Sequence, residues 1–182
     1  GVAQVISLGE SKMLLDNDSE AENLTIETPA VFNITKGITF EFMGRQSVAG
    51  AAATATLDFG VGGNAALGSA AERARFDAAT AGFKRAHFRM IGASTVIYAS
   101  TDDNVTPVGP TDIVTYANST TVNQRFLVIV RPTGVCEFWA GAITTGAETF
   151  TRVLSTTAFT MALATTTLLS GVVNLSKPAT TD

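Results

Sequence analysis

Short runs in which apolar and polar residues alternate, separated by turn residues, recur along most of the chain. Ile38, Phe40 and Phe42 alternate with Thr and Glu, and 53–59 repeats the pattern with Thr54, Thr56 and Asp58 opposite apolar residues. Such alternation places the apolar side chains on one face of a strand. Turn signals about every 8 to 12 residues are typical of an antiparallel sandwich or barrel. The sequence therefore predicts an all-β fold, a β-sandwich of two antiparallel sheets.

The segment 124–142, QRFLVIVRPTGVCEFWAGA, contains two strongly apolar runs on either side of the turn 131–134. Pro and Gly within so short a connection predict a β-hairpin. Every residue of 126–130 is apolar, so both faces of this strand are expected to be covered. A loop of the same chain or another subunit would provide the second cover. We interpret this strand as a first indication of assembly.

The chain is expected to form one sandwich domain preceded by an extension. Residues 1–30 are acidic, are interrupted by Pro29 and precede the regular strand pattern, so they are predicted to form an N-terminal arm, with 31–182 as the sandwich. The one clear helical segment is 65–79, where Ser69 and Glu72 have the spacing of a capping box. A short helix is expected there.

Composition excludes several classes of partner. Charged residues make up only 15% of the chain, below the roughly 25% of a typical soluble domain. This favours a protein that is packed against others, although a β-rich protein with a threonine-covered surface is the open alternative. The net charge of -4 argues against a nucleic-acid binder. Neither a signal peptide nor a membrane-spanning run of about 18 apolar residues is visible.

No catalytic constellation is apparent, and an enzyme is not expected. His87 stands in KRAHFRM, between basic residues that supply no orienting carboxylate, so a strand-surface histidine is predicted rather than a member of a Ser-His-Asp triad. Asp58 and Glu41 each stand alone in their strands, so the paired carboxylates of a glycosidase are missing. Cys136 is predicted to be a buried, inert thiol.

No metal or cofactor is predicted. One Cys and one His exclude a Cys/His zinc site within one chain. The spacing of Asp16, Asp18, Glu20 and Glu27 resembles a calcium-binding loop, but Ala21 replaces the required Gly, so a solvated acidic turn is favoured. A metal-binding loop at 102–104 is a weaker alternative, since its remaining ligands are missing.

Acidic residues gather in 10–27 and basic residues in 73–89. Opposed patches steer head-to-tail contacts or docking onto an acidic partner, whereas two ordinary solvated faces would carry no such role. The basic stretch is a candidate dock for the acidic arm. The residues selected as packing and assembly candidates are Phe126, Val128, Val130, Phe138, Trp139, Arg73, Arg75, Arg85 and Arg89.

The segment 88–142 resembles the second half of a concanavalin A/laminin-G-like jelly roll. A strand pair leads to the acidic loop STDDN, then to a strand of the type at 126–130, a tight turn and a strand that ends in Phe138-Trp139-Ala140-Gly141. The chain is also similar to jelly-roll structural proteins of tailed-phage virions, in which STDDN and a terminal NLSKP-like segment follow in this order. The resemblance covers roughly 35–178 and rests on residue types rather than on invariant chemistry.

This resemblance implies a structural protein of a bacteriophage virion, a capsid decoration or cement protein. It would be made in the host cytoplasm and would bind the major capsid protein on the capsid surface as a homo-oligomer, for example a trimer. Binding only to the assembled shell would stabilise that shell by mass action. The alternatives are a carbohydrate-binding, lectin-like module of a tail fibre or receptor-binding protein, and a hydrolase, which the missing carboxylate pair opposes.

Overall fold

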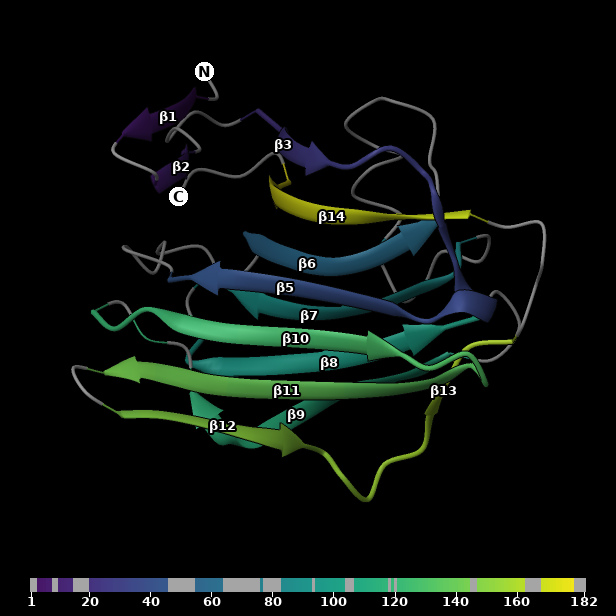
Figure 1. Cartoon of the computed structure of the whole chain (residues 1–182). Coiled ribbons are helices and arrows are strands. Elements are labelled where there is room, and N and C mark those ends of the chain that lie inside the picture. The colour runs from purple at the N-terminus through teal and green to yellow at the C-terminus, as the bar shows by residue number, and fades with distance from the viewer. Residues whose placement is uncertain are drawn as a thin grey trace.

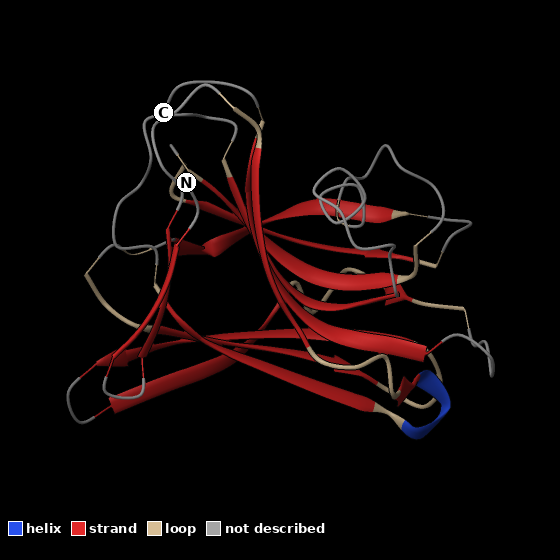
Figure 2. Cartoon of the chain, turned by 90° about the horizontal axis from the view of Figure 1, so that it is seen from above, coloured by secondary structure: helices blue, strands red, loops and turns tan. Residues whose placement is uncertain are grey.

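The protein is a two-layered β-sandwich, as predicted (Figures 1 and 2). The computed structural model describes residues 3–7, 10–14, 20–45, 55–63, 76, 83–92, 94–103, 107–117, 119, 121–144, 147–162 and 168–178. Within these residues every element is a strand except the short 3-10 helix η1 (Ile34–Lys36). The predicted helix at 65–79 lies outside the described residues, apart from Phe76, which is part of a turn.

One layer is a seven-stranded antiparallel sheet. The sheet order is β3 (Glu22–Glu27), β14 (Leu168–Lys177), β6 (Thr56–Gly63), β7 (Arg85–Ile91), β8 (Val96–Asp102) and β9 (Val108–Ala117), with β4 (Phe32–Asn33) also pairing with β14. The strands from β6 to β9 are neighbours in the order in which they follow in the sequence, whereas the C-terminal strand β14 lies between β3 and β6.

The second layer is a five-stranded antiparallel sheet, and the predicted hairpin forms its centre. The turn is closed by the amide of Arg131, which donates to the carbonyl of Val135 over 2.7 Å. The sheet order is β12 (Ala147–Val153), β11 (Val135–Thr144), β10 (Gln124–Val130) and β5 (Ile38–Gly44), with β13 (Phe159–Thr160) pairing with the start of β11. A separate hairpin is formed by β1 (Ala3–Ser7) and β2 (Glu10–Leu14).

Aromatic side chains from both sheets meet between the layers. The ring of Phe126 on β10 lies 5.0 Å from that of Phe59 and 5.1 Å from that of Phe88. Phe138 on β11 meets Phe88 edge-on at 5.1 Å. All four rings are buried. Edge-to-face and offset pairs of this kind are favourable beyond the area they bury, so this cluster joins the two sheets.

The N-terminal extension does not end where the sequence suggested. Residues 22–27 form β3, which pairs along its whole length with β14. Lys177 and Glu22 face each other in this pairing, with 3.4 Å between Nζ and Oε2 and both side chains almost fully buried. Residues 22–27 are therefore part of the sandwich rather than of an arm, because they complete an edge of the seven-stranded sheet.

Candidate assembly surface and a buried polar cluster

The two faces of the β10–β11 hairpin have different partners. Phe126, Val128 and Val130 alternate with half-buried residues and point into the core, as does Phe138. These four assembly candidates therefore pack between the sheets of one chain and are not available to a second subunit. Leu127, Ile129 and Trp139 lie on the other face of the hairpin. Because Leu127 and Ile129 are also apolar, every residue of 126–130 is apolar although only one face of the strand packs in the core.

Two aromatic residues, Trp139 on β11 and Phe150 on β12, lie side by side on this outer face, which is turned toward the viewer in Figure 1. The rings of Trp139 and Phe150 stack with 5.9 Å between centroids and an interplanar angle of 25°. The guanidinium carbon of Arg125 lies 5.1 Å from the centre of the Phe150 ring, a cation–π distance. The indole N–H of Trp139 donates to Oε2 of Glu137 over 3.2 Å. Trp139 and Phe150 are both only half-buried.

Charged pairs lie beside these apolar residues. Arg125 donates to Glu41 across β10 and β5, and Arg131 donates twice to Glu137, over 2.9 and 3.0 Å. The hydrogen bonds from Arg131 hold the pKa of Glu137 below its ordinary value. Such exposed pairs add little stability. Aromatic and Arg side chains are, however, enriched at protein–protein interfaces.

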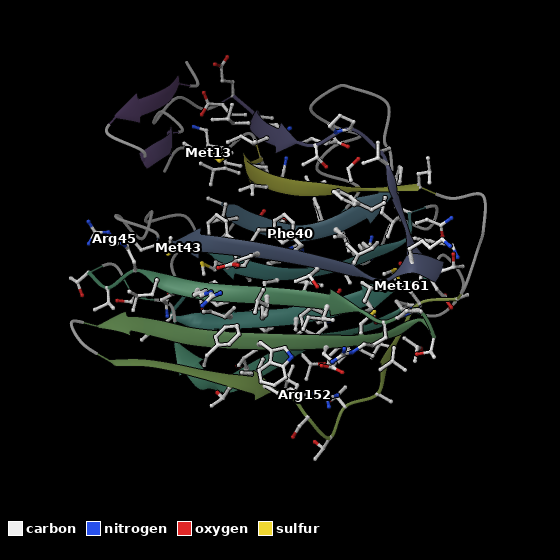
Figure 3. All side chains as sticks on the ribbon, viewed as in Figure 1. Met13, Phe40, Met43, Arg45, Arg152 and Met161 are labelled. Carbon is white, nitrogen blue, oxygen red and sulfur yellow. The ribbon has the colours of Figure 1, made fainter. Side chains whose placement is uncertain are left out.

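Two further exposed side chains extend the surface to its edges. Met43 on β5 is 62% exposed, and Arg152 on β12 is exposed on the opposite margin (Figure 3). The charge of Arg152 helps to lower the pKa of Glu137, although no hydrogen bond or ion pair joins Arg152 to another described residue. We call the outer face of β5, β10, β11 and β12 the assembly surface. Of the sequence-selected candidates that fall within the described residues, Trp139 alone lies on it.

A second concentration of polar side chains lies on the outer face of the seven-stranded sheet, on β6, β7 and β8. Asp58 receives two hydrogen bonds from Arg89, from Nε over 2.6 Å and from a terminal nitrogen over 3.1 Å. Nε2 of His87 lies 3.6 Å from the same carboxylate. Arg89 also donates to the carbonyl of Phe76 over 2.8 Å, and the Phe76 ring lies 4.8 Å from the imidazole.

Burial dominates the electrostatics of this cluster. Asp58 is 1% and His87 2% exposed. Burial raises the pKa of Asp58 against the opposing effect of Arg89. Burial, with the charges of Arg89 and Arg85, lowers the pKa of His87 well below its ordinary value. The imidazole is thus neutral, and its Nδ1 has no partner within the described part of the chain.

Two sequence-based interpretations are corrected by this cluster. His87 is not a surface residue, since it is buried beside Asp58, which the β6–β7 register places opposite Arg89. Arg85 and Arg89 do not form an exposed docking site for the N-terminal segment. Arg85 is buried, with a terminal nitrogen 3.0 Å from Oδ2 of Asp102, and Arg89 forms an ion pair with Asp58. Alternation of Ala86, Phe88 and Met90 signalled that the basic side chains share a face. Which carboxylates oppose them depended on strand pairing, which the sequence did not reveal.

The remaining candidates lie partly outside the described residues. Arg73, Arg75, Asp16, Asp18 and Asn104 fall there. In the part of the chain that is described, no group of three or more His, Cys, Asp or Glu side chains is placed to hold a metal ion. Within the same residues, no helix is long and apolar enough to cross a membrane. Cys136 is buried, as predicted, and burial raises its pKa to about 12.

No protein-family model and no curated protein matches the sequence. Among solved structures, scytalido-glutamic peptidase with a transition state analog inhibitor matches with a TM-score of 0.40 and 12% identity over 76% of this chain. A second structure of that peptidase, with a peptide based transition state analog, gives 0.39 and 11% over 86%. The chain spans 57% and 63% of the lengths of those two proteins. A similarity this distant assigns neither a family nor an activity.

Proposed function

We propose that the chain is a structural protein of a bacteriophage virion, a capsid decoration protein that binds the outer shell as a homo-oligomer. The observation that carries this proposal is the assembly surface, where Trp139, Phe150 and Leu127 lie partly exposed beside two ion pairs. The low content of charged residues and the likeness of 88–142 to virion jelly rolls support it further. Within the described residues no hydroxyl or thiol is hydrogen-bonded to His87, so the buried cluster offers no assembled nucleophile.

Co-sedimentation with capsid shells tests this proposal. Shells assembled from the major capsid protein of the same genome would be incubated with the purified chain and pelleted. We expect the chain to pellet with assembled shells, but not with unassembled capsid protein, and to raise the temperature at which the shells disassemble. The variant Trp139→Glu should pellet less efficiently, because loss of oligomers removes the avidity of binding several sites at once.

Thr133→Glu is the matched control, because it introduces the same charge at an exposed residue of the β10–β11 turn. This variant should pellet like the wild type. If the wild type leaves the shells entirely in the supernatant and does not change their disassembly temperature, the proposal is wrong.

The second candidate function is carbohydrate binding, and the stacked Trp139 and Phe150 rings are the observation in its favour. Sugar rings pack against exposed aromatic faces, and Glu137 and Arg125 would supply hydrogen-bonding groups beside them. Titration of a panel of oligosaccharides, with the heat of binding measured by calorimetry as the readout, separates the two functions. A saturable change that Trp139→Ala abolishes would favour the sugar-binding module, whereas a flat titration would favour the structural protein.

A further inference from the structure

The charged and apolar residues of the assembly surface are ordered so that the surface is complementary to a rotated copy of itself. Glu41 on β5 is the cross-strand neighbour of Leu127 on β10, Leu127 is that of Trp139 on β11, and Trp139 is that of Arg152 on β12. One row across the sheet therefore reads acidic, apolar, apolar, basic. The acidic and basic ends are three strand spacings apart, about 14 Å, so they do not pair with each other within one chain.

We propose that the assembly surface binds a second copy of the same chain through a twofold axis that lies in the interface, parallel to the strands and between β10 and β11. This rotation brings β5 of one copy over β12 of the other. Glu41 of each copy then faces Arg152 of the other, and Leu127 faces Trp139. The proposal deepens the proposed function and rests on its assignment of this face to assembly.

The next row of residues across the sheet is compatible with the same twofold rotation. Met43, Arg125, Gly141 and Phe150 are successive cross-strand neighbours. Rotation places the exposed Met43 of one copy over the Phe150 ring of the other, a favourable sulfur–aromatic contact. Twofold interfaces require self-complementary patches of this kind.

The charges are placed to bridge the two copies. Packed sheets lie about 10 Å apart, a distance that extended Glu and Arg side chains span together. Arg152 is exposed, and although its charge acts on Glu137 of its own chain, no hydrogen bond or ion pair among the described residues holds it there. A carboxylate accepts hydrogen bonds at both oxygens, so Glu41 can retain Arg125 and still receive Arg152 of the other copy. Each dimer would contain this bridge twice.

Charge exchange tests the arrangement. Sedimentation equilibrium would compare the wild type with Glu41→Lys, Arg152→Glu and the double variant that carries both substitutions. We expect the wild type to be a dimer, with twice the 18.9 kDa mass of one chain. Each single variant should raise the dissociation constant at least tenfold, because like charges then face each other twice. The double variant restores opposite charges across the axis and should return to within a few-fold of the wild type.

Two control variants change the charge equally outside the assembly surface. Glu20→Lys and Lys36→Glu, both at exposed positions, should dimerise like the wild type. Thermal unfolding of every variant establishes that the exposed substitutions leave the fold intact. A double variant that is as weak as either single variant would overturn the twofold register, as would a trimer or larger ring. A wild type that stays monomeric would overturn self-association, whereas binding to the capsid shell would still stand if that monomer pelleted with shells.

Discussion

Asp58 and His87 are buried diagonal neighbours on the adjacent strands β6 and β7, with 3.6 Å between Oδ1 and Nε2. This arrangement resembles a catalytic Asp–His pair, but the hydrogen bonds from Arg89 to the carboxylate give it a different role. Two short hydrogen bonds from Arg89 satisfy the carboxylate, so Asp58 does not require a protonated imidazole. The neutral histidine is the form that burial and two nearby guanidinium groups favour.

Stability should consequently depend on pH through His87, the single histidine of the chain. Because its pKa in the folded state lies well below the ordinary 6.5, the unfolded chain binds the proton first as pH falls. The free energy of unfolding should therefore decrease below pH 6.5, by up to about 1.4 kcal/mol per pH unit. Urea unfolding of the wild type and His87→Gln between about pH 8 and pH 5 measures this. Parallel profiles for the two proteins would contradict the prediction.

Removal of the buried carboxylate should cost far more than removal of an exposed one. Asp58→Asn keeps the size of the side chain but leaves Arg89 beside an uncharged amide, and breaking a buried pair in this way costs about 3 to 5 kcal/mol. Glu41→Gln changes the exposed pair with Arg125, for which about 0 to 1 kcal/mol is expected. Urea unfolding of the wild type and the two variants measures both losses in the free energy of unfolding. Equal losses would show that the Asp58–Arg89 pair is not a buried structural contact.

Local patterns in the sequence predicted the strands but not which strands are neighbours. Alternation of Phe40 and Phe42 with polar residues, and the turn at 131–134, are local properties, so β5 and the β10–β11 hairpin followed directly. The partner of β6 is β7 on one side and β14, more than a hundred residues away, on the other. The contact of Asp58 with Arg89 and His87 depends on the register between β6 and β7, which no local pattern encodes, so it could not be derived either.

The same limit explains the misplaced N-terminal boundary and the interpretation of 126–130. The edge strand at 22–27 is polar and short, and only its pairing with β14 shows that it belongs to the sandwich. In 126–130 the apolar residues of both faces were visible, yet the sequence could not say which set faces the core. The structure assigns the core to Phe126, Val128 and Val130 and leaves Leu127 and Ile129 outside.

Adjacent residues of β11 should separate folding from assembly. Phe138 is 1% exposed and contacts the rings of Phe88 and Phe159, so Phe138→Ala should cost about 3 to 5 kcal/mol. Trp139→Ala removes a half-buried ring stacked on Phe150 and should cost only about 1 kcal/mol in the monomer. Chemical unfolding measures both, and light scattering should show that Trp139→Ala weakens association. If both substitutions left stability unchanged, the assignment of faces would be wrong.

Truncation should distinguish the first hairpin from the edge strand. A chain that begins at residue 20 keeps β3 and the Glu22–Lys177 contact and should unfold at nearly the urea concentration of the full chain. A chain that begins at residue 28 loses six residues of pairing with β14 and leaves the Lys177 ammonium group without Glu22. It should unfold at a clearly lower urea concentration. Equal midpoints for these two truncated chains would mean that β3 does not contribute to the sandwich.

Cys136 should report on opening of the sandwich. Its thiol is 1% exposed, lies 3.6 Å from the carbonyl of Gly134 and has a pKa of about 12. Since the thiolate is the reactive form, only about one molecule in ten thousand would react readily at pH 8, even before the cover of the core is considered. Native protein should therefore react with a thiol reagent only as fast as it unfolds, and urea should accelerate labelling. Thr133→Cys adds a thiol at an exposed position in the same hairpin and should be labelled within the mixing time, whereas Cys136 in that variant stays protected. Rapid labelling of wild-type Cys136 without denaturant would show that the five-stranded sheet opens at β11.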